Sequence, residues 1–193
     1  MPAPCFTSQL GTAINSGCST QVVGVEEKAV IIPLSLINKA TLAYDADSLI
    51  VNTLALISGT GYAVNVRGDM PFSDMTFEGE KLPNGQVKFD KTAIFRIIGN
   101  SPAISKQVMQ LGVGKYAMVF QMKGYAAADK NKYLIVGLDR GLSLTTASYS
   151  QASQDEFGWN ITLVEPEAIT SSQWYWPAAG EAAADSWFAG LTA

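Results

Sequence analysis

Short runs of β-branched and aromatic residues, each ended by turn-forming residues, recur along most of this chain. The runs 62–67, 73–81 and 159–164 alternate apolar and polar side chains, which is the period of a half-buried strand. The runs 115–123 and 132–138 are almost wholly apolar, which indicates strands that are buried on both faces. Further β-rich runs lie at 21–25, 29–37, 48–57, 86–98 and 141–149. Pro33 lacks an N–H, so we expect an edge or a bulge there.

One turn is marked clearly. Pro83-Asn84-Gly85 separates the run 73–81 from the run 86–98. Asn-Gly is a strong hairpin signal because both residues tolerate positive φ. We therefore predict a hairpin tipped at Asn84 and Gly85.

One helix is also well marked, between Ser101 and Gly112. Ser101 is a good N-cap, Pro102 suits the first turn, and Gly112 suits a left-handed C-terminal position. Between them Ile104 and Val108 recur at helical spacing. The segment is too short to be stable alone, so it needs a sheet to lie on.

The fold class follows from these elements: mainly β, a β-sandwich or partly closed β-barrel with one flanking α-helix, plus extended N- and C-terminal arms. We expect an N-terminal arm at 1–20, a β domain at 21–167 and an aromatic C-terminal extension at 168–193, with a short helix over 181–191. Aromatic side chains carry large apolar areas, so the extension must dock on its own domain or on a neighbouring subunit. Its candidate interface residues are Trp174, Tyr175, Trp176, Trp187 and Phe188.

Composition restricts the partners. Charged residues make up 16% of the chain, against about 25% in typical globular proteins. Such low charge favours surface that meets other subunits. The net charge is −4 and no basic block occurs, so tight nucleic-acid binding is not expected. No apolar run reaches the length of about 18 residues that a membrane helix needs, and the first residues do not read as a signal peptide.

No catalytic, metal or cofactor site is expected. The chain has no histidine, which removes the commonest general base and zinc ligand. Neither a phosphate-binding loop nor a nucleophile elbow is present. Cys5 and Cys18 are expected to be free thiols, although a disulfide between them is possible.

Three carboxylate pairs remain: Asp45 with Asp47, Asp155 with Glu156, and Glu165 with Glu167. A hydrolase or a calcium site would use such groups, but we interpret them as solvated turn residues and strand ends. The tripeptide 139–141 is interpreted as a turn with a local ion pair.

The second half of the chain has a family resemblance. The turn Gly137–Leu142 (GLDRGL) precedes the strand Gly158–Leu163 (GWNITL) near the C-terminus. This order is similar to the closing strands of phage tail tube and related virion proteins, particularly those of Bacteroidetes phages and prophages. The resemblance covers residues 115–167, and Cys18 with the following Gly24 and Val25 is loosely similar to the group's N-terminal region. The tryptophan-rich extension departs from the pattern.

The resemblance implies a non-enzymatic virion subunit of the phage tail or neck, assembled in the host bacterium. It implies stacked hexameric or dodecameric rings of copies, in contact with other tail or neck proteins, around a channel through which genomic DNA passes without specific binding. An acidic lining would let phosphates slide, and open sheet edges would be consumed by subunit contacts.

Three alternatives stay open. The chain could be a head–tail connector, neck or tail-hub ring instead of the tube subunit. It could be a surface adhesin or carbohydrate-binding β-sandwich that stacks sugars on Trp174, Tyr175 and Trp176. The least favoured is a small hydrolase that uses carboxylates alone.

Overall fold

The computed structural model describes residues 25–45, 49–65, 74–125, 130–151, 158–171 and 173–192. The expectations for the arm at 1–20, the strand at 21–24, both cysteines, Asp47, Asp155 and Glu156 lie outside these residues.

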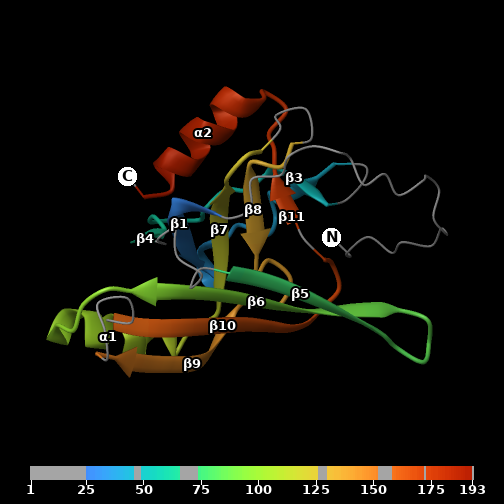
Figure 1. The fold of residues 1–193 in the computed structure, drawn as a ribbon. Coiled ribbons are helices and arrows are strands. Elements are labelled where there is room, and N and C mark those ends of the chain that lie inside the picture. The colour runs from blue at the N-terminus through green and yellow to red at the C-terminus, as the bar shows by residue number, and fades with distance from the viewer. Residues whose placement is uncertain are drawn as a thin grey trace.

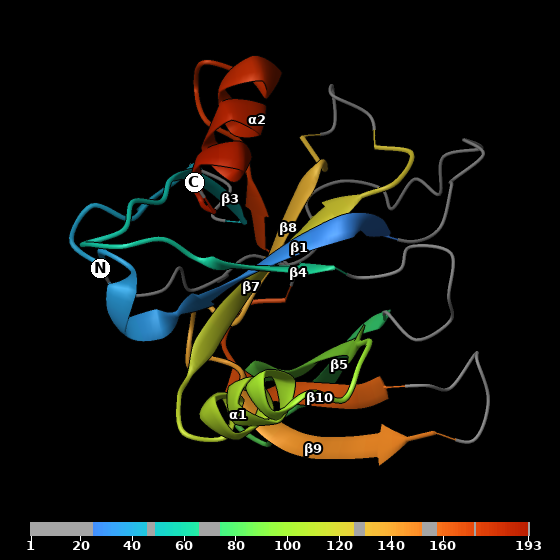
Figure 2. The same ribbon diagram turned by 90° about the vertical axis from the view of Figure 1, so that its left-hand side faces the viewer.

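The described chain forms two β-sheets that pack face to face, with one helix on an outer face of the pair and the other at one end of it (Figures 1 and 2). A seven-stranded sheet has the order β2-β3-β11-β8-β7-β1-β4, and a four-stranded antiparallel sheet has the order β5-β6-β10-β9. The predicted mainly-β class, a sandwich with a flanking helix, is confirmed. The strands of the first sheet are β1 (Val25–Pro33), β2 (Ala43–Tyr44), β3 (Ile50–Thr53), β4 (Tyr62–Asn65), β7 (Tyr116–Met122), β8 (Tyr133–Val136) and β11 (Gln173–Tyr175). Those of the second are β5 (Asp74–Lys81), β6 (Val87–Ile97), β9 (Ser143–Ser150) and β10 (Gly158–Ala168).

The main core fills the space between the two sheets. Alternate residues of β1, β7 and β8 meet the inward residues of β6 and β10, as period-two side-chain placement requires. Phe95, Phe120 and Ile161 are fully buried at its centre. The inward face predicted for β10 is confirmed, because Ile161 and Leu163 are buried and Trp159 packs against the same core.

A second core lies on the opposite face of the seven-stranded sheet. There Val119, Ile135 and Tyr175 are covered by α2 (Glu181–Gly190), through residues such as Ala184. The sheet is therefore the middle of three layers, which Figure 1 shows with α2 above it and the four-stranded sheet below. Burial on both faces explains why β7 and β8 are almost wholly apolar.

The C-terminal extension is part of this architecture rather than a separate extended arm. β11 lies inside the seven-stranded sheet, antiparallel to β8 and parallel to β3. The predicted C-terminal helix is confirmed as α2. The apolar area of the extension is what holds it down, because β11 and α2 contribute directly to the second core.

Helix α1 (Pro102–Leu111) covers one end of the sandwich, with Ile104, Val108 and Leu111 against the main core. Ser101 caps it as predicted, because its Oγ accepts a hydrogen bond from the Ile104 N–H at 3.2 Å. The prediction for Gly112 was wrong: its φ of −71° is right-handed. The helical turn simply runs on through this residue, where the Gly112 N–H donates to the Met109 carbonyl.

Three strand expectations also need correction. The strand expected over 48–57 is only β3, and the chain then makes a single bridge between Leu56 and Ile37. β1 is not an edge strand, since it pairs with both β4 and β7. Pro33 is tolerated because it is the last residue of β1 and lies beyond the part that pairs with β4. β10 is longer than expected and passes Pro166 with a bulge, where Glu167 adopts a φ of 55°.

None of the helices within the described ranges is long and apolar enough to cross a membrane.

Candidate functional site

The most prominent surface feature is the hairpin of β5 and β6. β10 pairs with β6 only from Phe89 onward, so beyond that point the hairpin consists of two strands alone. Figure 1 shows this part extending past the end of the sandwich. The predicted tip is confirmed: Gly85 has a φ of 84°, and its N–H donates to the Leu82 carbonyl at 2.9 Å. Asn84 supports the turn by accepting a hydrogen bond from the Gln86 N–H.

The projecting part of the hairpin is exposed. Residues 83–87 are all exposed, and Val87 is 46% exposed. Lys88 pairs with Glu80 at 3.2 Å across the two strands. β5 and β9 are the outer strands of the four-stranded sheet, so each has one side without a strand partner among the described residues. Such edges are available for pairing with another chain.

The aromatic residues of the C-terminal extension contact their own domain. The Tyr175 ring stacks on Trp187 with ring centroids 3.7 Å apart, and Phe188 stacks on Tyr133 at 4.8 Å. Trp187 Nε1 donates to the Leu54 carbonyl at 2.9 Å. Trp174 packs against the main core, and Trp176 is half-buried after β11. Of the candidate interface residues, Asn84 and Gly85 are therefore exposed, whereas the aromatic ones already have intramolecular contacts.

A salt-bridge cluster fastens α2 to the sheet. Lys132 Nζ lies 2.8 Å from Glu181 and 2.6 Å from Asp185, and Tyr133 donates to Asp185 at 2.7 Å. Tyr125 donates a further hydrogen bond to Glu181. Burial lowers the pKa of Lys132, but its hydrogen bonds to Asp185 and Glu181 outweigh burial and raise it. The hydrogen bond from Lys132 lowers the pKa of Glu181. Burial raises the pKa of Asp185, but its hydrogen bonds with Lys132 and Tyr133 outweigh burial, so this pKa is lowered as well.

A cleft of about 1410 Å³ has two walls. One is the β4 side of the seven-stranded sheet, and the other is formed by α1 and the end of β6. Exposed Ile57, Tyr62 and Ile98 lie along it. Among its described lining residues are Lys39, Arg96 and Lys115 but no carboxylate. An acid-based hydrolytic site is therefore not formed by the part of this cleft that the structure describes.

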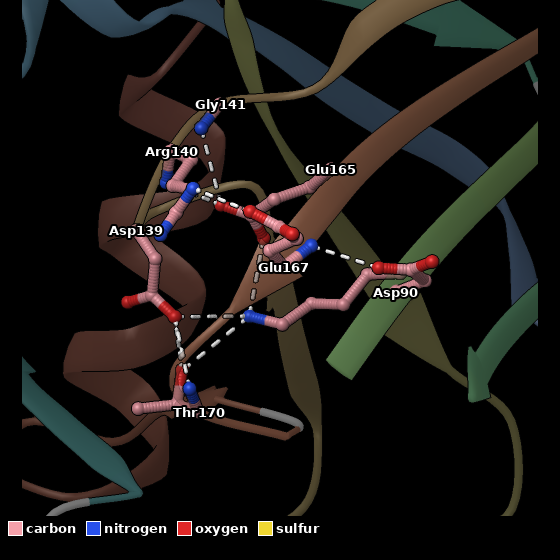
Figure 3. Close-up of polar contacts among 8 residues, drawn as sticks. Asp90, Asp139, Arg140, Gly141, Glu165, Glu167 and Thr170 are labelled. Carbon is pink, nitrogen blue, oxygen red and sulfur yellow. Dashed lines mark hydrogen bonds and ion pairs between the residues drawn. The ribbon is translucent and has the colours of Figure 1, made fainter. Parts of the chain in front are cut away.

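A buried polar cluster connects the two sheets (Figure 3). Lys91 on β6 and Glu165 on β10 are both fully buried and pair at 3.1 Å between Nζ and Oε2. Asp139, in the turn after β8, lies 3.5 Å from the same Nζ through its Oδ2. The N–H groups of Arg140 and Gly141 donate to Glu165 Oε1 at 2.6 and 3.1 Å.

Asp139 has a second partner, Thr170, whose hydroxyl oxygen also lies 3.4 Å from Lys91 Nζ. Thr170, just after β10, donates to Asp139 Oδ2 from both its N–H, at 3.1 Å, and its hydroxyl, at 2.6 Å. At the surface, Arg140 pairs with Glu167 at 3.2 Å, and the Glu167 N–H donates to Asp90. The interpretation of Glu165 as a solvated strand end was therefore wrong. The local ion pair expected of the turn 139–141 is replaced by pairs with distant residues, because Arg140 pairs with Glu167 on β10 and Asp139 pairs with Lys91 on β6.

Sequence reasoning missed Lys91, although strand parity could have found it. Lys91 has the same parity as Ala93 and Phe95 on β6, and Glu165 has the same parity as Ile161 and Leu163 on β10. Inward parity on two strands, with opposite charges, is the signal for a buried pair. Lys91 and Glu165 are direct cross-strand partners.

No family model, curated protein or solved structure matches this chain. Within the described residues, no group of three or more His, Cys, Asp or Glu side chains is placed to hold a metal ion.

Proposed function

We propose that this chain is a non-enzymatic virion structural protein of a bacteriophage, a tail tube-like subunit that forms stacked rings around the DNA-conducting channel. The observation that carries the proposal is the two-stranded end of the β5–β6 hairpin, which extends beyond the sandwich and exposes its tip. The tip of such a hairpin does not pack against its own domain, so the domain does not stabilise it. A neighbouring subunit would supply the missing contacts.

Two further features support assembly. The outer strands β5 and β9 leave backbone groups on one side without strand partners among the described residues. The exposed apolar side chains Ile57, Tyr62 and Ile98 lie along one cleft, and clustered apolar exposure is typical of subunit contacts. A net charge of −4 suits a channel that conducts DNA without retaining it.

A head–tail connector or tail-hub ring uses the same features and remains the alternative within the class. The carbohydrate-binding alternative loses support, because Tyr175 is only 5% exposed and its ring is covered by Trp187. A sugar platform needs aromatic faces that are open to solvent.

Negative-stain microscopy of the purified protein at high concentration tests the proposal. We expect discrete rings or tubes from the wild type. Val87→Asp, on the hairpin, should abolish them, because a charge placed in a subunit contact is desolvated without a partner. Val113→Asp is the matched control: Val113 is 90% exposed in the turn after α1, and its variant should assemble normally.

A wild type that stays monomeric at high concentration would overturn the assembly proposal. Rings that persist in Val87→Asp would retain assembly but remove the hairpin from the contact. Circular dichroism of both variants checks that they are folded.

A further inference from the structure

The polar cluster between the sheets contains more charged groups than a single ion pair. It holds one lysine and two carboxylates, with Lys91 and Glu165 fully buried and Asp139 at 11% side-chain exposure. Burying charge is costly, and an unequal number of opposite charges increases that cost. A reaction that joins the lysine to one carboxylate as an amide would reduce three buried charges to one, on Glu165, which the N–H groups of Arg140 and Gly141 hold.

We propose that Lys91 and Asp139 form an intramolecular isopeptide bond, and that Glu165 is the catalytic residue that moves the protons. The three side chains meet at one point: Lys91 Nζ lies 3.1 Å from Glu165 Oε2 and 3.5 Å from Asp139 Oδ2. Holding reactants in contact replaces a bimolecular encounter with an intramolecular step, which lowers the barrier.

Glu165 is placed to accept a proton. Its Oε1 is held by the N–H groups of Arg140 and Gly141, which fix the carboxylate. Its Oε2 is buried and accepts no well-aligned hydrogen bond from the described residues, although it lies beside Lys91 Nζ. One oxygen of Glu165 thus anchors the group, and the other faces the amine.

Thr170 is placed to stabilise the addition intermediate. Its N–H and its hydroxyl both donate to Asp139 Oδ2. When nitrogen adds to the Asp139 carboxyl carbon, negative charge develops on an oxygen of that group. Two donors already directed at Oδ2 form an oxyanion hole for it.

The step balances without any co-reactant. Glu165 takes a proton from the Lys91 ammonium and passes it to Asp139 Oδ1. Lys91 Nζ, now an amine, attacks Asp139 Cγ, and the negative charge forms on Oδ2. A second proton from Nζ reaches Oδ1 through Glu165, the Cγ–Oδ1 bond breaks, and water leaves. An ammonium and a carboxylate have become an amide and one water, and Glu165 ends as the carboxylate it began as.

The bond would join two parts of the chain that belong to different sheets. Lys91 belongs to the four-stranded sheet, and Asp139 lies in the turn that follows β8 of the seven-stranded sheet. A covalent link there would hold the two layers together under mechanical load. The cross-link closes a loop of chain between residues 91 and 139, which restricts the unfolded state as a disulfide does.

Intact mass spectrometry of the folded full chain tests the proposal. We expect the wild type to be one water molecule lighter than its sequence. Lys91→Arg and Asp139→Ala should have their full sequence masses, and Glu165→Gln should lose the water slowly or not at all. Asp139→Asn should lose one ammonia instead, because an amide nitrogen is then the leaving group.

The matched control is Lys88→Arg. Lys88 is the neighbouring inter-strand lysine on β6, paired with Glu80 and Glu167, and its variant should keep the full water deficit. Protease digestion followed by fragment sequencing should recover one branched peptide that contains both Lys91 and Asp139.

A folded wild type with the full mass of its sequence overturns the proposal. So does a water deficit that persists in Lys91→Arg, or one that fragment sequencing assigns to another position. The wild-type measurement decides the question even if every cluster variant fails to fold.

Discussion

Replacing Trp187 with alanine tests whether the C-terminal extension belongs to the folded domain. Trp187 is half-buried, stacks on Tyr175 and lies edge-on to Tyr133 with centroids 6.4 Å apart. An aromatic pair contributes about 0.5–1.5 kcal/mol beyond area burial. Its Nε1 hydrogen bond to the Leu54 carbonyl adds about 0.5–1.5 kcal/mol.

The expected loss follows from these contributions. A fully buried tryptophan costs about 3–5 kcal/mol when truncated to alanine. Because Trp187 is only half-buried, we expect Trp187→Ala to lower the free energy of unfolding by about 2–4 kcal/mol. Trp187→Phe should keep the stacking and lose the hydrogen bond alone, at a cost of about 1 kcal/mol.

Urea unfolding followed by far-ultraviolet circular dichroism measures both variants. The reasoning is refuted if Trp187→Ala changes the free energy of unfolding by less than about 0.5 kcal/mol, the range of ordinary surface substitutions. That result would mean that α2 does not rest on the sheet in solution, and that the aromatic residues are available to neighbouring subunits instead.

Three further predictions follow from other contacts. Gly137→Ala should destabilise the fold by about 3 kcal/mol or more in urea unfolding, because Gly137 has a φ of 93° and an added Cβ would lie 2.5 Å from the Tyr116 carbonyl oxygen. Ser101→Ala should cost about 1 kcal/mol in the same assay, through loss of the α1 cap. Glu181 and Asp185 have pKa values below their ordinary values of 4.5 and 3.8, so their ionised carboxylates stabilise the fold at a pH above those ordinary values. This contribution is lost as the pH falls through the lowered pKa values. The urea midpoint should therefore drop in this acidic range. The drop should be smaller in the double variant Glu181→Gln with Asp185→Asn.

Much of the fold could be predicted because its local signals agree with its tertiary structure. The turn at Asn84 and Gly85 and the cap at Ser101 are local chemistry, so a short stretch of sequence is enough to identify them. The apolar runs of β7 and β8 predicted burial on both faces for the same reason.

What could not be predicted depends on distant partners. Nothing near Trp174 indicates that β11 inserts between β3 and β8, because the partner strands lie far away in the sequence. The strand expected at 48–57 is cut short by the chain's turn away after Thr53. Lys91 resembles any strand lysine until Glu165 and Asp139 are placed around it.

The position of β11 has a consequence for how the protein is made. Among the described strands, β2 and β3 join the rest of their sheet through β11, which is synthesised after all the other strands of that sheet. Until β11 leaves the ribosome, β3 and β8 each lack the strand that pairs with them on one side in the folded sheet. This layer is therefore completed only after β11 has been synthesised, and a message cut short before residue 173 would yield a product that chaperones and proteases recognise as incomplete.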